Sequence, residues 1–590
     1  MSAEESKEQS LFQNLLQRHV IQSVGLYVAA AWGVVEILLT LQDTLGWPAW
    51  IAKVVLALFI AGFPVVLGLS WYRDLQSRWA RLGVSGGALA IAGFALWTVL
   101  ATPPPEPLYS GPLIDSASTV VVAPFDIRGD ETSESYLSRG FTGELIARLS
   151  KDPRLSVIQQ ESLSSPVVAS LTPTFLAREV GADHVVEGGI RREGDFIEVQ
   201  VWLRNSAGEV QYSDTLREPY SAIAIAEMQR RISSEVSRAL GSTLDGDSYC
   251  GDTTDLDAME LYFQGRSEVG MRVAERIEAG IDFLKEAVER DPYYGRAWNQ
   301  LGEAYSVLPA MMDNSEGQAD ARRRTTAPMA RRAFQRALDI CPRLGLAYKM
   351  LVPDYDVPNR WIGSEMEFRD ATSMDPNDSS LLRAYMRFLL ATGRMSEAAR
   401  IGRRAYDNDP LVANIIGRYA NALYFAGRCE EALPLAEEAQ SLRGRGGRMV
   451  IENCAVEAAR ARGEDTELPP EEEEKLLAQA RALWEMPASE RPRGAMNRIV
   501  FTFIAGRDFD LAFDALNSVA RYGSWDNAIA GGYENIWYPL EPFDEFRSDP
   551  RFAELMKTVG LDEYWTEYGY PDFCAPADDG FRCGARQTSM

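Results

Sequence analysis

Few side chains in this sequence could support acid–base or nucleophilic chemistry. The chain has 590 residues but only two histidines, His19 and His184. His184 follows Asp183 and lies close to Glu187, an arrangement that would suit a general base oriented by a carboxylate. No nucleophile and no set of metal ligands accompanies it, so we interpret His184 as a structural histidine. The sequence therefore predicts no catalytic residue, no metal site and no cofactor site.

Two other features of the sequence could suggest an enzyme. The pair Gly188-Gly189 could cradle a phosphate, but the chain contains no GxxxxGK[ST] motif. A glycine pair inside a strand more often marks a bulge or close packing, and we adopt that interpretation. Carboxylate pairs are abundant among 85 acidic residues, so they distinguish no active site. We expect a protein that is not an enzyme.

The cysteines point to crosslinks more than to metal binding. Six cysteines, at positions 250, 341, 429, 454, 574 and 583, form no C-x-x-C motif. Cys574 and Cys583 lie nine residues apart in a tail that can form little core, and they are our candidate disulfide if the tail is in an oxidising compartment. Two free thiols are the alternative. Cys429 and Cys454 are a weaker second candidate pair, because they could face each other across consecutive helices.

The charge of the chain argues against nucleic-acid binding. The formal net charge is −25, and residues 1–101 contribute none of it, since their six basic and six acidic residues cancel. An acidic surface repels phosphate, so DNA and RNA are disfavoured as partners. The excess would suit a basic partner, although solubility is the simpler explanation.

A repeat of 34 residues organises the middle of the chain. Pro342, Pro376 and Pro410 end three helical patterns at this interval, and the pairs Gly393-Arg394 and Gly427-Arg428 share it. A helix pattern with Trp298, Leu301, Gly302 and Tyr305 matches the W-x2-L-G-x2-Y signature of the tetratricopeptide repeat, or TPR, at all four positions.

These features predict paired helices that stack on one another. The second helices of the pairs are expected at 281–288, 333–340, 398–405 and 432–439, and helical patterns without the 34-residue phase follow at 446–461, 470–486, 493–505 and 508–520. One pair cannot bury its own apolar face, so stacking produces a superhelix with a concave surface. We assign TPR-like helical repeats to 255–520, and a C-terminal cap and tail to 521–590.

The amino-terminal part reads as a membrane anchor over residues 1–101. The stretches 54–72 and 82–101 contain no charged residue and are long enough to span a bilayer as helices. A weaker third span at 20–41 contains Glu36. An intramembrane acid is a candidate functional residue, or it faces a neighbouring helix.

The loop charges predict the orientation of this anchor. Arg73, Arg78 and Arg81 lie between the second and third spans, whereas no basic residue follows the third span until Arg128. The positive-inside rule therefore places the arginine loop in the cytoplasm and everything after residue 102 on the opposite side. The Pro-rich stretch within 102–116 reads as an extended linker.

Residues 117–241 carry the pattern of a small α/β domain. Strands are predicted at 119–125 and 155–158, and a three-stranded antiparallel meander at 184–216. Helices are predicted at 137–149, 173–181 and 221–240; the first has an apolar stripe at every fourth residue.

Three motifs of this domain resemble the TolB-amino-terminal-like domain: Val121-Val-Ala-Pro-Phe125, the stretch from Tyr136 to Ile146, and the stretch from Gly181 to Arg191. In bacteria that domain recurs between a membrane or signalling module and TPRs, often in proteins described as adenylate-cyclase-like. The anchor and the tail from Trp537 to Cys574 are similar to those proteins too. This chain has no cyclase domain and no basic winged-helix module, so the resemblance implies neither cyclase nor DNA-binding activity.

The sequence thus predicts a multi-domain fold: an α-helical transmembrane anchor of three spans, a small α/β domain and an all-α TPR solenoid. The expected function is a multi-pass inner-membrane scaffold of bacteria whose periplasmic TPR groove binds protein or peptide partners. The alternative is an envelope sensor that relays ligand or partner binding across the membrane to a cytoplasmic component. Its support is Glu36 and the arginine loop at 73–81.

Overall fold

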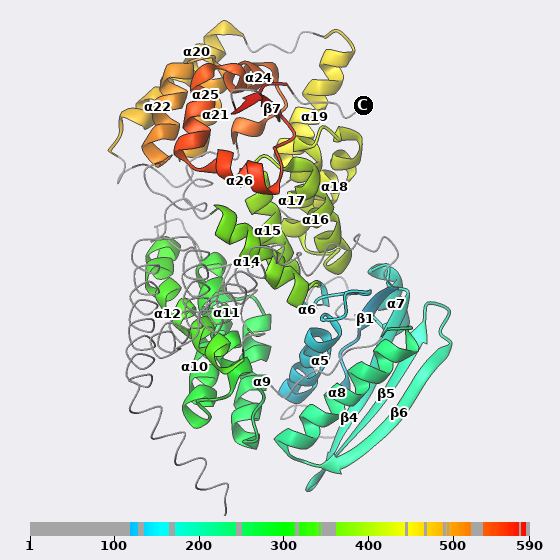
Figure 1. Cartoon of the computed structure of the whole chain (residues 1–590). Helices are drawn as coiled ribbons and strands as arrows, with labels where there is room; N and C mark the ends of the chain where they lie inside the picture. Colours follow the sequence, from blue (N-terminus) through cyan, green and yellow to red (C-terminus); the bar gives the residue numbers. More distant parts are fainter. Residues whose placement is uncertain are drawn as a thin grey trace, which may run out of the picture. The chain divides into compact units, whose positions relative to one another are not determined.

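The computed structural model describes most of the chain after residue 117 (Figure 1). The chain divides into two compact units, Met1–Ser110 and Gly111–Met590. All described residues belong to the second unit: 118–127, 135–163, 171–242, 251–312, 318–341, 344, 361–442, 447–464, 469–487, 491, 495–520, 535–577 and 580–585.

The first part of this unit is built on one six-stranded sheet. Its strands are β1 (Ser118–Val122), β2 (Asp126–Ile127), β3 (Leu155–Val157), β4 (His184–Glu193), β5 (Phe196–Asn205) and β6 (Val210–Pro219). Their order is β3-β1-β4-β5-β6, with β2 paired to β4. β1 runs parallel to β3 and β4, whereas β4, β5 and β6 form the predicted antiparallel meander.

Helices cover both faces of the sheet because its central strand is apolar on both sides. Along β1, Val120 and Val122 belong to the core under α5 (Ser135–Leu149) and α8 (Ala222–Ala239), while Val121 packs on the opposite face against α7 (Pro173–Glu179). Ser221 caps α8, since its hydroxyl accepts a hydrogen bond from the Ala224 N–H at 3.2 Å. A short helix, α6 (Gln160–Leu163), follows β3.

Helical hairpins make up the remainder of the unit (Figure 1). The helices are α9 (Leu256–Gly270), α10 (Ala274–Arg290), α11 (Gly295–Met311), α12 (Gln318–Ile340), α14 (Trp361–Met374), α15 (Ser379–Ala391), α16 (Met395–Asn408), α17 (Ala413–Phe425), α18 (Cys429–Ser441), α19 (Arg448–Ala461), α20 (Pro470–Glu485), α21 (Ala495–Ala505) and α22 (Phe509–Ala520). Neighbouring helices pack in pairs, among them α9 with α10, α11 with α12, α15 with α16 and α17 with α18.

The hairpins α15–α16 and α17–α18 have the same backbone conformation and hydrogen bonds at positions 34 residues apart. Gly393 and Gly427 both adopt left-handed backbone conformations, with φ of 82° and 68°. The residue after each glycine donates its N–H to a carbonyl near the end of the first helix, Arg394 to Leu389 at 3.0 Å and Arg428 to Leu423 at 2.9 Å. Glycine is favoured at this position because other residues are strained there. The prediction of a helical repeat region is confirmed.

The hairpins divide between two apolar cores. Helices α9–α12 share one core with α5, α8 and the sheet. A Cβ on Gly140 of α5 would collide with the Phe263 ring of α9, so these two helices approach closely. The second core joins α14–α22 to a C-terminal segment: η1 (Asn535–Trp537), α24 (Glu541–Ser548), α25 (Pro550–Thr558), α26 (Leu561–Tyr568), β7 (Cys574–Ala577) and β8 (Gly580–Cys583).

Two buried tryptophans connect the C-terminal segment to the repeats by hydrogen bonds. Trp565 donates its indole N–H to the Thr392 carbonyl at 2.9 Å, and Trp537 donates to the Ala391 carbonyl at 3.2 Å. Both carbonyls lie at the end of α15, where they have no partner within the helix. The C-terminal segment therefore completes the second core and satisfies this helix end.

The predicted fold class, a three-span transmembrane anchor followed by an α/β domain and an all-α solenoid, requires correction. In the part of the chain that the structure describes, no helix is both long and apolar enough to cross a membrane. For example, α12 has 23 residues but carries several arginines. The predicted spans at 20–41, 54–72 and 82–101 and the linker at 102–116 lie outside the described residues. The helical part also ends in a two-stranded sheet and shares a core with the α/β domain, because α9 packs on α5.

Candidate functional site

The four residues of the TPR signature lie on α11, and they pack helices together. Leu301 and Tyr305 are buried, and Trp298 is half-buried with its indole N–H donated to the Pro292 carbonyl at 3.1 Å. A Cβ on Gly302 would lie 2.5 Å from the Phe334 ring of α12. The small residue lets the two helices of this hairpin approach.

The other residues that the sequence singled out do not assemble into a site. His184 is half-buried at the start of β4, opposite Val120 and Asn205. Nearby Glu187 pairs with Arg204 at 2.6 Å. A Cβ on Gly188 would collide with the Phe125 ring, so close packing explains this glycine. Glu36 lies outside the described residues.

All cysteines in the described ranges are in disulfides. Cys574 and Cys583 are bonded across the β7–β8 hairpin, with their Cα atoms 4.0 Å apart. Cys429 and Cys454 join α18 to α19, with their Cα atoms 5.6 Å apart. Cys341, which follows α12, is also disulfide-bonded. The crosslinks thus lie in the helical part and its C-terminal hairpin.

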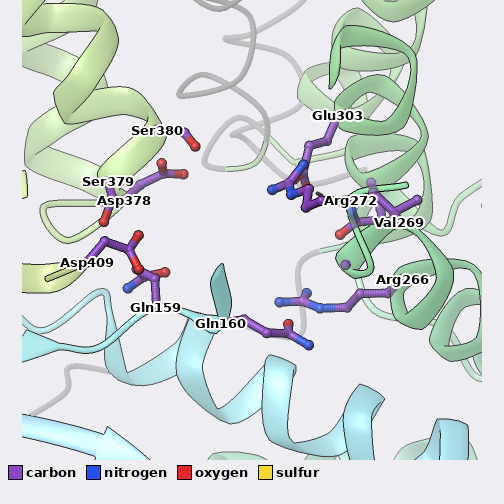
Figure 2. A pocket seen from close by; sticks show the side chains of 12 residues that line it. Gln159, Gln160, Arg266, Val269, Arg272, Glu303, Asp378, Ser379, Ser380 and Asp409 are labelled. Atoms are coloured by element: carbon purple, nitrogen blue, oxygen red, sulfur yellow. Dashed lines mark hydrogen bonds and ion pairs between the residues drawn. The ribbon is translucent and has the colours of Figure 1, made fainter. Parts of the chain in front are cut away.

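A polar cavity of about 90 Å³ lies where the α/β domain meets two separate groups of hairpins. We call it the junction cavity (Figure 2). Its lining comes from α6 and the residue before it, from α9 and the turn after it, from α11, from the start of α15, and from the residues before α15 and α17: Gln159, Gln160, Arg266, Val269, Gly270, Arg272, Gln300, Glu303, Asp378, Ser379, Ser380 and Asp409.

One wall of the junction cavity carries two arginines. Figure 2 shows the guanidinium groups of Arg266 and Arg272 directed into the cavity. Arg272 bonds Glu303 at 3.0 Å, and Gln300 donates to the same carboxylate at 2.7 Å. Arg272 also has a positive φ of 52°, a conformation that costs a non-glycine residue about 1 kcal/mol. This strained turn directs the Arg272 side chain towards α11 and the cavity.

The opposite wall is acidic and carries hydroxyl groups. Asp378 caps α15, accepting the Leu381 N–H at 2.8 Å, and Asp409 accepts the Ser162 hydroxyl at 2.8 Å. The carboxylates of Asp378 and Asp409 face the arginine wall in Figure 2. Ser379 is 97 % buried, and its hydroxyl makes no hydrogen bond in the part of the chain that the structure describes. An unpaired buried hydroxyl is costly, so it marks a position where a bound group could supply the partner.

Arg266 also belongs to a buried cluster that we call the ionic joint, formed by Glu144, Arg148, Asp252, Arg266 and Arg296. Glu144 of α5 pairs with Arg296 of α11, with Arg266 at 3.5 Å and with Arg148 at 3.7 Å. Burial raises the pKa of Glu144, but the charges of these three arginines outweigh it and hold the pKa at about 2. The ionic joint therefore keeps a charged carboxylate inside the interface between α5 and the helices.

A second contact, the amide joint, connects the α/β domain to the turns before α15 and α17. Its residues are Ser156, Ser162, Asn377, Asn408 and Asp409. Asn377 donates to the Ser150 carbonyl at 2.9 Å, and Ser156 donates its hydroxyl to the Asn408 side chain at 2.8 Å. These turns contain Asp375-Pro376 and Asp409-Pro410, the pairs that mark the repeat in the sequence. The repeat turns thus serve as the docking points for the α/β domain.

The residues of the cavity and of the two joints were not predicted from the sequence. The apolar stripe at every fourth residue marks one face of α5, whereas α5 is covered by the sheet on one side and by α9 on the other. A signal was nevertheless present. Gly140 and Gly143 disfavour a helix unless something packs closely against them, and Glu144 follows directly. In the structure the two glycines face Phe263 and Arg266.

Comparisons with known proteins add little to this description. No family model matches the chain, and no curated protein matches it. Among solved structures it is similar to YrrB, a TPR protein described as having an unusual peptide-binding site. The sequences are 15 % identical, the match covers 34 % of this chain and 92 % of the other, and the TM-score is 0.21. The repeat assignment therefore rests on the hairpins of this chain itself.

Proposed function

We propose that this protein is a scaffold that binds a protein or peptide partner along its helical repeats. The observation that carries the proposal is the convergence of first helices on one recess. Arg266 of α9, Glu303 of α11 and Ser380 of α15 all line the junction cavity, and each lies on the first helix of its hairpin. Within each group, stacked hairpins present their first helices on one face, a surface suited to an extended partner, and the two faces meet at the junction cavity.

The two joints support a binding role for this face. They hold the α/β domain against both groups of hairpins through buried and hydrogen-bonded contacts, and the C-terminal segment completes the second core. A surface held in one shape loses less conformational entropy when a partner binds. The proposed activity is recognition, and it includes no catalytic step.

Site-specific photo-crosslinking in cells would test the proposal. A photoreactive amino acid at Asn414, which is exposed on the first helix α17, is expected to capture a discrete partner. The matched control is the same amino acid at Arg400, which is exposed on the second helix α16. Capture of the same proteins at both positions, or none at Asn414, would contradict binding along the first-helix face.

We also propose that the described part of the protein works in an oxidising compartment, such as the periplasm. The disulfides at Cys341, Cys429–Cys454 and Cys574–Cys583 support this, because cytosolic reductants keep most thiols reduced. Alkylation in intact cells, followed by denaturation, should modify these cysteines only after a reductant is added. Modification without reductant would argue for a reducing compartment.

A further inference from the structure

We propose that the junction cavity binds a small zwitterion, an α-amino acid whose ammonium group faces Asp378 and Asp409 and whose carboxylate faces Arg266 and Arg272. The proposal adds a small-molecule site to the partner-binding function and does not depend on it. It rests on the charge of the two walls, the unpaired hydroxyl of Ser379 and the size of the cavity.

The opposite signs of the walls select the chemical class. Carboxylates of Asp378 and Asp409 lie on one side of the cavity, and the guanidinium groups of Arg266 and Arg272 lie on the other (Figure 2). The Glu303 carboxylate bonds Arg272 on that second side, so the two arginines leave it with a net charge of one positive unit. A ligand with one charge would be attracted to one wall and repelled by the other. A ligand carrying both charges on a short framework matches both walls.

The hydroxyl of Ser379 offers a hydrogen-bond acceptor at the acidic wall. Ser379 is the first residue of α15, and a first-turn N–H group has no partner inside its helix. Its hydroxyl is buried and lacks a partner among the described residues, although it lines the cavity. A ligand ammonium would donate to this oxygen, and the charge would strengthen the bond.

The cavity has a suitable size. Roughly 10–15 Å³ of cavity space is enough for one water molecule, so about 90 Å³ holds several waters or a ligand of a few heavy atoms. The floor adds the amides of Gln159 and Gln160 and no large apolar surface, which favours amino acids with small side chains.

Calorimetric titration of the full-length protein would test the charge requirement. The probes are alanine, alaninamide, which keeps only the ammonium, and N-acetylalanine, which keeps only the carboxylate. Alanine is expected to bind at least about tenfold more tightly than either blocked compound, since each lacks one charged hydrogen bond. Equal binding of a blocked compound, or no binding of alanine, would overturn the proposal.

Two substitutions locate the site. Ser379→Ala should weaken alanine binding about fivefold, with an unchanged or higher melting temperature of the free protein, because the hydroxyl it removes is unpaired. Arg272→Gln should weaken it about tenfold or more. The matched control is Ser237→Ala, on α8 and away from the cavity, which removes another buried hydroxyl that has no partner among the described residues. Unchanged affinity in both cavity variants would overturn the proposal, whereas partner capture from position 414 would remain informative about the scaffold.

Discussion

The α/β domain is held to the helices by two joints of different chemistry. The ionic joint buries Glu144 among three arginines and adjoins the apolar contact between α5 and α9. The amide joint consists mainly of neutral hydrogen bonds, such as that from Ser156 to Asn408. The ionic joint adjoins the core that the α/β domain shares with α9–α12, whereas the amide joint connects the α/β domain to the helices of the second core.

This difference predicts how each contact would open. Separating the ionic joint exposes apolar core and leaves buried charges without partners, which costs several kcal/mol. Opening the amide joint exchanges a few hydrogen bonds for bonds to water, with a net cost of roughly 1 kcal/mol each. We therefore expect the α/β domain and α9–α12 to unfold together, and the amide joint to open locally more often.

Loss of the Glu144 charge should give the largest effect. Glu144→Gln leaves Arg148, Arg266 and Arg296 with too little buried negative charge, so we expect a loss of about 3–5 kcal/mol in the free energy of unfolding. Denaturant unfolding followed by tryptophan fluorescence would measure it. The control is Glu227→Gln, at a half-exposed ion pair with Arg230, which should cost less than about 1 kcal/mol. Similar losses in the two variants would show that burial of the cluster contributes nothing.

The ionic joint should also fail in acid. Because the folded pKa of Glu144 is lowered to about 2, its stabilisation is complete above its ordinary value of 4.5 and disappears as the pH falls towards 2. The shift corresponds to roughly 3 kcal/mol. The difference in stability between wild type and Glu144→Gln should therefore shrink steadily below about pH 4.5, which parallel denaturation curves would reveal. A difference that stays constant down to pH 2 would contradict this.

A smaller effect is expected at the amide joint. Asn408→Ala removes the acceptor for Ser156 and the donor to Asn377, so we predict a loss of about 1–3 kcal/mol. Hydrogen exchange should accelerate at 155–163 and near the start of α17, while the sheet keeps its protection. The control is Gln440→Ala, an exposed amide on α18. Global acceleration across the sheet would mean that the two joints open as one.

What the sequence could predict was local. The glycines at 393 and 427 and the residues after them end helices through hydrogen bonds to carbonyls three and five positions back, so a period in the chain was enough to find the hairpins. The apolar run at β1 is local too: its consecutive apolar residues were enough to predict a strand covered on both faces.

The joints and the junction cavity depend on residues far apart in the chain. Glu144 meets Arg266 and Arg296 only after α9 and α11 fold onto α5, and no period connects these positions. Ser379 follows an aspartate that caps a helix, and in the sequence it is indistinguishable from an ordinary first-turn serine. Its unpaired hydroxyl appears only when the neighbouring elements surround it.

An effect of opposite sign is expected at Asp375. Asp375 and Asp409 are equivalent positions 34 residues apart, each followed by proline. Asp409 accepts hydrogen bonds from the Ser162 N–H and hydroxyl, but the Asp375 Oδ1 atom is buried without a partner in the described residues. Burial and the charge of Asp378 raise the pKa of Asp375 to about 7, against the opposing charges of Lys151 and Arg404.

The sign of the pH dependence follows from this raised pKa. Between pH 4 and 7 the unfolded state has released the Asp375 proton while the folded state retains it, so stability falls as the pH rises through this window. Asp375→Ala should therefore raise the melting temperature at pH 8, on the order of 2 °C, and the gain should vanish by pH 4. Asp409→Ala should lower it, because Ser162 loses its acceptor. Thermal melts of both variants from pH 4 to 8 would measure this, and a loss of stability in Asp375→Ala at pH 8 would mean that its carboxylate has a stabilising partner.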